Sequence, residues 1–223
     1  FYLDRPTQVF VIDVAKAIAT DPTAEVAKAD DVKKPSLEGI GTEPTQLTFD
    51  DAISAIEWHG DDLLAIRSRR NALADDLVRI TPDAEVSVVE FPAIGGDAAN
   101  GVWTPLAVSS TGQDLWLLVA DLGPDEMDFI GGMGTLASAR LEGNTLADFE
   151  VHTDHNVESL TSTAFAATDD GVYISRENRG TVELVKFADG QITPIFDGPV
   201  VLSGLDVAGE TMLAVAATAT SIG

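Results

Sequence analysis

WTPLAVSSTGQDLWLLVAD, at positions 103–121, holds two apolar segments separated by a short polar turn. The first segment, 103–110, is rich in small residues, whereas the second, 114–121, is apolar at consecutive positions. A short continuous apolar run of the second kind is typical of a β-strand that is covered on both faces. Two further strand-like segments follow at 135–141 and 146–152. The stretch therefore predicts one sheet of four strands, named A, B, C and D in chain order.

The same order of four strands recurs along the chain. Unit starts fall at residues 53, 103, 159 and 201. A four-stranded unit that repeats about every 50 residues is typical of the blades of a β-propeller. The small residues of the A strands fit this fold, because the innermost strands crowd around the central channel. The remaining predicted strands are 53–59, 62–68, 76–80 and 86–91; 159–167, 171–177, 181–187 and 192–196; and 201–207 and 211–217.

The two ends of the chain hold partial units. Residues 8–14 predict a C strand and 44–49 a D strand, whereas 201–217 hold only an A and a B strand. We therefore predict an all-β fold, a β-propeller with about three complete four-stranded blades plus partial blades at both ends. The propeller region covers 1–223, with polar insertions at 15–43 and 122–134, and we expect it to be a fragment of a larger propeller. A β-sandwich is the alternative, since it also uses short alternating strands.

Composition excludes several classes of function. The chain has 37 Asp and Glu against 13 Lys and Arg, a formal net charge of −24. Nucleic acids and anionic membranes are therefore not expected as partners, because both require clustered Lys and Arg. The absence of cysteine removes disulfides, thiolate nucleophiles and thiolate metal ligands. We expect neither a signal peptide nor a transmembrane segment in this chain, and we expect a cytoplasmic location.

Local motifs give little catalytic chemistry. His152, His155 and Asp154 could bind Zn²⁺, but a solvated loop is the favoured interpretation. GGMG at 131–134 precedes a strand rather than the helix that a phosphate-binding loop requires. The nucleophile motif Gly-x-Ser-x-Gly does not occur. No catalytic, cofactor-binding or metal-binding residue is therefore assigned, and no cofactor is expected.

Two side-chain sets could contact a ligand. Arg67, Arg69 and Arg70 form the densest basic cluster, RSRRN, and could bind a carboxylate or phosphate in bidentate fashion. Pairing with nearby carboxylates, such as those of Asp75 and Asp76, is the favoured alternative. The three tryptophans, Trp58, Trp103 and Trp116, could stack on sugars, but packing between blades is the commoner use of such side chains.

The quoted segments resemble the propeller of prolyl oligopeptidase-family serine peptidases, a group that includes acylaminoacyl peptidases and dipeptidyl aminopeptidases. QVFVIDV (8–14) resembles a blade strand of that family, and residues 155–221 resemble its last blades. The turn that reads Trp-Ser-Pro-Asp-Gly in the family is degenerate here, at 58–62 and at 109–113. The resemblance implies an α/β-hydrolase domain downstream of this chain, with its own Ser, Asp and His, none of which can be placed on these residues.

Three functions stay open at this stage. In the first, the chain is the non-catalytic propeller of a serine peptidase, which gates access of short peptides and packs on its own hydrolase domain. In the second, a stand-alone propeller binds a protein or a carbohydrate. In the third, a propeller enzyme binds a metal through inward groups, for which the candidates are Glu57, His59, Glu158 and Asp206. Exposed strand edges at the partial blades also predict a homo-oligomer.

Overall fold

The computed structural model describes residues 9–11, 45–46, 52–69, 72–127, 134–196, 200–208 and 211–218. The predicted insertion 15–43, residue Arg70 and residues 128–133 of the second insertion lie outside these ranges. Within them the chain forms sixteen strands and two short 3₁₀ turns, Ile94–Gly96 and Ala98–Asn100. No helix in this part of the chain has the length and apolar character needed to cross a bilayer.

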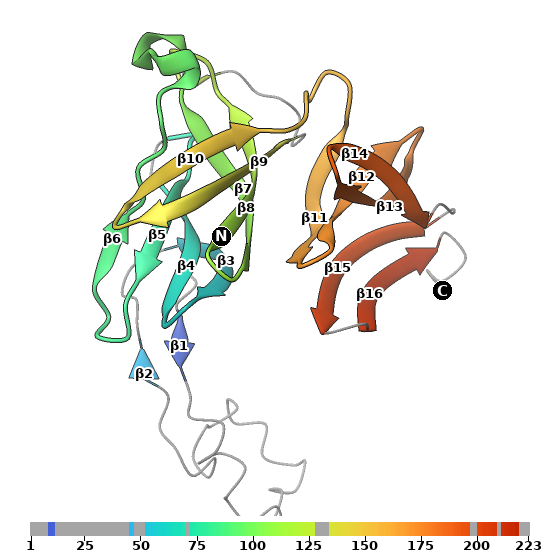
Figure 1. The fold of residues 1–223 in the computed structure, drawn as a ribbon, viewed down its shortest axis with the longest axis horizontal. Coiled ribbons are helices and arrows are strands. Elements are labelled where there is room, and N and C mark those ends of the chain that lie inside the picture. The colour runs from blue at the N-terminus through green and yellow to red at the C-terminus, as the bar shows by residue number, and fades with distance from the viewer. Residues whose placement is uncertain are drawn as a thin grey trace, which may run out of the picture.

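Three complete four-stranded antiparallel sheets follow one another along the chain (Figure 1). Their strands pair in chain order within each sheet, so each sheet is a meander, and the four-strand units of the sequence are confirmed. We number these sheets 1, 2 and 3. Sheet 1 consists of β3 (Ala52–His59), β4 (Asp62–Ser68), β5 (Asp76–Ile80) and β6 (Val86–Val88); sheet 2 of β7 (Trp103–Thr111), β8 (Asp114–Asp121), β9 (Thr135–Glu142) and β10 (Thr145–Val151); sheet 3 of β11 (Leu160–Thr168), β12 (Gly171–Asn178), β13 (Thr181–Ala188) and β14 (Gln191–Phe196).

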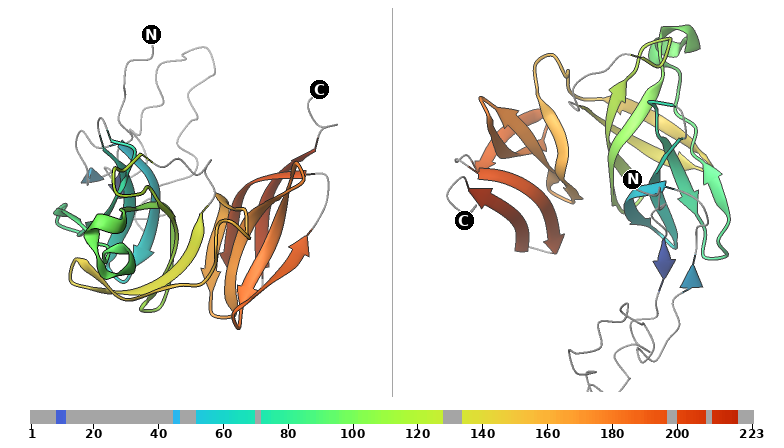
Figure 2. Two further views of the ribbon diagram at one scale, coloured as in Figure 1. Left: turned by 90° about the horizontal axis from the view of Figure 1, so that it is seen from above. Right: turned by 180° about the vertical axis from the view of Figure 1, so that it is seen from behind.

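Two-stranded sheets stand at both ends of the series. β1 (Phe10–Val11) pairs with β2 (Thr45–Gln46), and β15 (Val200–Ala208) pairs with β16 (Thr211–Thr218). These are the partial C–D and A–B units that the sequence predicts. The five sheets do not close into a ring in this part of the chain, and Figure 2 shows them as an open arc.

Apolar cores lie between consecutive sheets rather than inside one sandwich. Leu64 and Leu77 of sheet 1 pack with Leu115 and Leu117 of sheet 2. A second cluster joins sheets 2 and 3, a third joins β1 to sheet 1, and a fourth joins sheet 3 to β15. A sheet that is covered on both faces by its neighbours explains why β8 is apolar at consecutive positions. This series of cores is the blade-on-blade packing of a propeller, not of a two-sheet sandwich.

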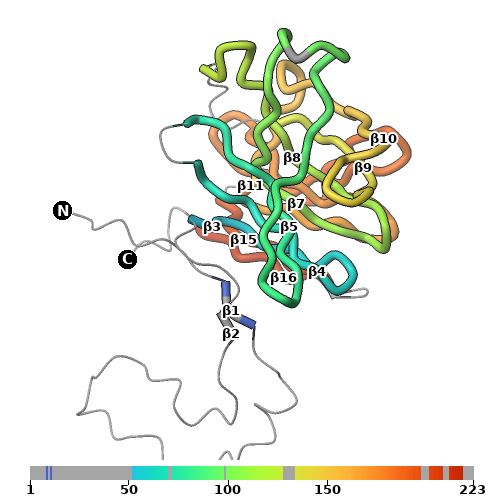
Figure 3. The backbone as a smooth tube through the Cα atoms, turned by 90° about the vertical axis from the view of Figure 1, so that its left-hand side faces the viewer, coloured from blue at the N-terminus to red at the C-terminus, as the bar shows by residue number. Residues whose placement is uncertain are grey.

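The first strands of consecutive sheets are neighbours, since β3 contacts β7, β7 contacts β11 and β11 contacts β15. Figure 3 labels these four strands in one region of the molecule. Each of them is bulged against its B strand at an equivalent place: between Ile53 and Ala55, Pro105 and Ala107, Thr161 and Phe165, and Leu202 and Gly204. A bulge bends the strand and increases its twist. Its repetition shows that the four sheets share one design.

One strand end and one glycine are decided by contacts between sheets. Strand D of sheet 1 ends at Val88 instead of the predicted residue 91, because Glu90 leaves the sheet and bridges Thr145 of β10. Gly134, the last residue of the GGMG motif, allows a close approach: a Cβ there would lie 2.8 and 2.9 Å from Cδ1 and Cδ2 of Leu118. The backbone of Gly134 also donates a hydrogen bond to the carbonyl of Leu160 in sheet 3.

Candidate functional site

A chain of polar contacts crosses the inner strands near their A–B turns. The backbone N–H of Ser110 donates to Glu57 Oε1 at 2.8 Å, and the Ser109 hydroxyl lies 3.4 Å from the same oxygen. Ser109 Oγ in turn accepts the backbone N–H of Ala167 at 3.0 Å. Sheets 1, 2 and 3 are thus joined by side chains that face the inside of the arc.

Glu57 is the titratable group at the centre of these contacts. Burial raises the pKa of its carboxyl, because desolvation disfavours the charged form, and the hydrogen bonds from Ser110 and Ser109 partly oppose this effect. The charge of Asp206 on β15 raises the pKa further. The charge on the fourth A strand therefore acts on the Glu57 carboxylate of the first.

His59 and Ser110 lie at the distance of a nucleophile and its base, since Nδ1 and Oγ are 2.8 Å apart. A catalytic triad also needs a carboxylate that orients the imidazole. The Glu57 carboxylate binds the backbone of Ser110 instead of the imidazole of His59. The three residues consequently join two sheets and lack the orienting contact of a triad.

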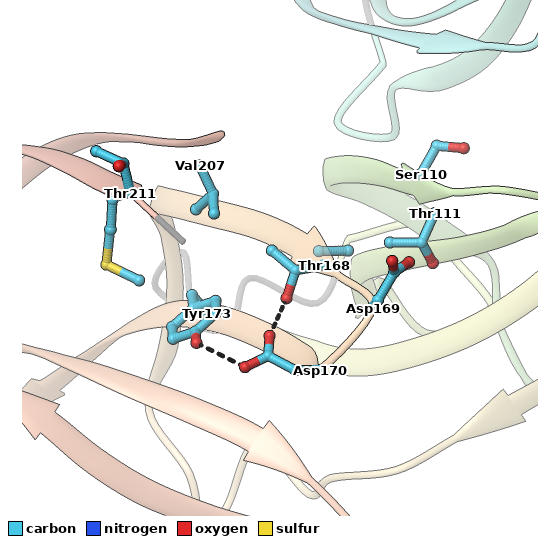
Figure 4. Close-up of a pocket in the computed structure, with 10 residues that line it drawn as sticks. Ser110, Thr111, Thr168, Asp169, Asp170, Tyr173, Val207 and Thr211 are labelled. Carbon is cyan, nitrogen blue, oxygen red and sulfur yellow. Dashed lines mark hydrogen bonds between the residues drawn. The ribbon is translucent and has the colours of Figure 1, made fainter. Parts of the chain in front are cut away.

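A pocket of about 760 Å³ opens between sheets 2, 3 and the β15–β16 pair. Figure 4 shows that Ser110 and Thr111 approach it from β7, Thr168, Asp169, Asp170 and Tyr173 from the β11–β12 hairpin, and Val207 and Thr211 from the last pair. Hydroxyl and carboxylate oxygens dominate the labelled wall. Such a lining can accept and donate hydrogen bonds to a polar chain, as a peptide ligand would require.

The two carboxylates of this pocket differ in their surroundings. Lys186 Nζ donates to Asp170 Oδ2 at 2.6 Å, and the hydroxyl of Thr168 also binds this carboxylate. These contacts, the one from Lys186 first, lower the pKa of Asp170 to about 2. The Asp169 carboxylate, exposed beside Thr111, makes no ion pair or hydrogen bond within the described part of the chain. One negative charge at the mouth of the pocket is therefore left without a partner there.

The basic cluster of the sequence lies elsewhere, at the B–C end of sheet 1. Arg67 Nη2 pairs with Asp76 at 2.8 Å, and Arg69 Nη2 pairs with Glu126 at 2.7 Å. Arg70 lies outside the described residues. The local pairing that the sequence favoured is therefore present for Arg67 with Asp76, whereas contact of these arginines with a ligand stays a prediction.

The residues of the histidine motif contact other protein groups instead of forming a metal site. The His152 ring stacks on Trp116 and Phe187, and its Nε2 lies 2.7 Å from Ser138 Oγ. Burial lowers the pKa of His152. Asp154 accepts the backbone and side-chain N–H groups of Asn156 and thus caps its own turn. Within the described ranges no three His, Asp or Glu side chains form a group that could hold a metal ion.

The other sequence candidates separate in the structure. Glu158 pairs with Arg176 at 2.9 Å and does not join Glu57 and His59. Trp116 packs between sheets 2 and 3, and Trp103 joins the core between sheets 1 and 2, so packing between blades is confirmed for both. Trp58 is 58% exposed in the described part of the chain, where it lines a small cavity together with Val11 of β1.

Sequence reasoning missed the hydroxyl residues of the inner strands. Ser109, Ser110 and Thr168 precede the A–B turns of sheets 2 and 3, where the sequence indicates only small, crowded residues. The recurrence of Ser or Thr before these two turns, at 109–111 and at 168, is the signal that could have found them.

Comparison with known proteins places the fold. No family model matches the chain, and no curated protein does so either. Among solved structures, the acylaminoacyl peptidase of Pyrococcus horikoshii superposes with a TM-score of 0.51 at 16% identity, over 78% of this chain and 25% of that one. A puromycin-hydrolyzing peptidase of Mycobacterium tuberculosis gives a TM-score of 0.52 at 10% identity, over 78% of this chain and 30% of that one.

A further match is the β-propeller domain of the trilobed protease of Pyrococcus furiosus, with 19% identity, a TM-score of 0.48 and coverage of 80% of this chain and 51% of that one. This chain thus spans about half of the length of the trilobed protease domain and 25% to 30% of the two peptidases. At these identities the likeness shows the fold, which is that of a β-propeller.

Proposed function

We propose that this chain is the propeller region of a serine peptidase of the prolyl oligopeptidase type, in which it controls the access of short peptides to a catalytic centre outside residues 1–223. The observation that carries the proposal is the β-propeller fold, found in solved peptidases, combined with a polar pocket on the inside of the arc. A cytoplasmic location is part of the proposal, and fractionation of cells that produce the protein tests it.

The chemistry of the pocket supports a role in passage or binding rather than in bond cleavage. The hydroxyl of Ser110, which lines the pocket, is engaged in a contact with His59 of sheet 1. The uncompensated Asp169 carboxylate and the net charge of −24 favour cationic over anionic peptides through steering. Passage through an opening lined by these polar side chains would select peptides by length and charge, and it requires no catalytic residue in this chain.

The test uses the polypeptide that naturally carries this region. A fluorophosphonate probe should label one serine outside residues 1–223 and should leave the 223-residue chain itself unlabelled. Absence of both labelling and peptide hydrolysis in the natural polypeptide would contradict the peptidase assignment. Hydrolysis without any selection for peptide length would contradict only the control of access.

Narrowing the pocket tests the access role at a defined residue. Thr111→Trp fills space at the pocket wall and should lower kcat/KM for an eight-residue peptide about tenfold, with much less effect on a single-residue ester. Thr145→Trp, on the exposed start of β10, is the matched control and should leave both substrates unaffected. Equal losses for peptide and ester with Thr111→Trp would argue against a role in access.

A further inference from the structure

A second cavity, a groove of about 550 Å³, lies between the turn ends of sheets 2 and 3. Its aromatic side chains are those of Trp116 and Phe187, which contact each other edge to face in the core between the two sheets. Both walls of the groove belong to complete four-stranded sheets. The groove is therefore a feature of the repeat itself and not of either end of the series.

Carboxylates surround this groove. Sheet 2 contributes one aspartate to its lining and sheet 3 contributes three, namely Asp114, Asp169, Asp170 and Asp189. Asp169 and Asp189 are exposed, and neither makes a hydrogen bond or an ion pair within the described part of the chain. The described residues that line the groove include no Lys or Arg. The groove thus carries negative charge that its own lining does not neutralise.

The other face of sheet 3 shows how this chain holds a cation. Lys186 Nζ donates to Asp170 Oδ2 at 2.6 Å and lies 5.4 Å from the centre of the Tyr173 ring. Tyr173 packs toward β15, whereas Phe187 packs toward sheet 2, so these rings lie on opposite faces of sheet 3. A carboxylate and an aromatic ring together stabilise the ammonium group on the first face. The groove presents the same two kinds of group on the second face, without a lysine or arginine of its own.

The arrangement of the carboxylates favours an organic cation over a metal ion. Within the described ranges, no three His, Asp or Glu side chains form a group that could hold a metal ion. A guanidinium is broad, planar and weakly hydrated, so it can stack on an aromatic ring while its N–H groups pair with carboxylates around it. Tryptophan is the side chain that attracts such a cation most strongly.

We propose that the groove binds a guanidinium group, that of an arginine side chain in a peptide. Trp116 stacks on the guanidinium, and the carboxylates of Asp169 and Asp189 accept its hydrogen bonds. Thr111 and Thr168 line both the groove and the pocket of Figure 4, so the two cavities adjoin, and a peptide bound in the groove continues into that pocket. The peptide as the source of the guanidinium rests on the proposed function, whereas binding of the guanidinium itself does not.

Saturation-transfer NMR on the polypeptide that naturally carries this region tests the binding with butylguanidinium. This probe has no peptide bond, so hydrolysis cannot interfere, and the neutral butylurea of nearly the same shape is the reference ligand. Butylguanidinium should bind at least about tenfold more tightly than butylurea, because only the cation pairs with the carboxylates and the ring. Equal affinities, or no binding of butylguanidinium, would overturn the proposal.

Substitution of two carboxylates locates the binding in the groove. Asp169→Asn with Asp189→Asn should weaken the binding of butylguanidinium about tenfold. The matched control is Asp61→Asn with Asp83→Asn, which removes two exposed aspartates from the corresponding turns of sheet 1, outside the groove. The control should bind as the unmodified protein does. Equal weakening in both variants, or none in the first, would overturn the proposal, because the cation would then respond to overall charge or bind elsewhere.

Substitution of the ring tests the aromatic contact. Trp116→Phe keeps an aromatic side chain in the core but weakens the attraction for a cation, so the affinity for butylguanidinium should fall about two- to threefold. Circular dichroism should show that this variant is folded. An unchanged affinity would overturn the stacking of the guanidinium on Trp116.

Hydrolysis separates this proposal from the proposed function. For a short peptide that contains arginine, Asp169→Asn with Asp189→Asn should lower kcat/KM about tenfold, and it should leave the same peptide with citrulline in place of arginine unaffected. Equal effects on both peptides would overturn the peptide as the source of the guanidinium. Absence of hydrolysis would contradict the proposed function, while the NMR titrations would still decide whether the groove binds a guanidinium.

Discussion

The contact between Gly134 and Leu118 permits a quantitative test of packing between sheets. Leu118 is fully buried in the core between sheets 2 and 3. Leu118→Ala should lower the free energy of unfolding by about 2–5 kcal/mol, the range for buried leucines that leave a cavity. Gly134→Ala should lower it by about 1–3 kcal/mol, because the new Cβ overlaps the Leu118 side chain.

The double variant carries the decisive information. The three nearest atoms to a Cβ at Gly134 are Cγ, Cδ1 and Cδ2 of Leu118, and alanine at 118 lacks all three. The overlap then disappears, and the added methyl group fills part of the cavity. The double variant should therefore be more stable than the sum of the single losses predicts, by about 0.5–3 kcal/mol.

Urea denaturation followed by circular dichroism measures all four proteins under the same conditions. Leu213→Ala is the control, since this leucine occupies the same strand type but is exposed at the end of the arc. The loss of unfolding free energy for this variant should stay below about 1 kcal/mol. Additive losses for Leu118 and Gly134, or a control as damaging as Leu118→Ala, would refute the stack of sheets.

Three further substitutions test contacts of the inner strands and of sheet 3. The raised pKa of Glu57 favours its protonated form in the fold, so Glu57 contributes stability below its unfolded pKa, and this stability is lost as the pH rises through its folded pKa. Glu57→Gln should therefore stabilise the protein at pH 7 but not at pH 4. Thermal melts at both pH values check this prediction. Ser109→Ala leaves the backbone N–H of Ala167 without its acceptor and should lower the free energy of unfolding by about 1–3 kcal/mol in urea denaturation. An unchanged urea midpoint would show that this hydrogen bond does not stabilise the protein. Arg176→Met removes the partner of two carboxylates, one of them nearly buried, and should lower the free energy of unfolding by about 3 kcal/mol in urea denaturation, whereas Arg140→Met breaks an exposed pair and should leave the urea midpoint nearly unchanged.

The sequence predicts the strands well because, in each sheet, every strand pairs with the strand next to it in the chain. Strands β4, β5 and β8 occupy the predicted ranges, since apolar runs end at turn residues such as Gly60 and Gly112, both of which adopt positive φ. Local periodicity and turn chemistry decide such elements without long-range information.

Contacts between sheets could not be read in the same way. The stacking of His152 on Trp116 and Phe187 joins residues of different sheets, and no spacing rule connects them. The exposure of Trp58 likewise depends on what lies beyond β3, not on the residues around it. The polar contacts from Glu57 to Ala167 require the A strands to lie side by side. The repeat predicts that arrangement, but it does not determine which hydroxyl groups form hydrogen bonds between the strands.

Selection by peptide length tests the central claim most directly. The measurement compares kcat/KM of the natural polypeptide for a short peptide and for the same cleavage sequence inside an unfolded chain of about 60 residues. A propeller that controls access predicts a value at least about 100-fold lower for the long chain, a difference of about 2.7 kcal/mol in transition-state free energy. Equal values for the two substrates would contradict the account.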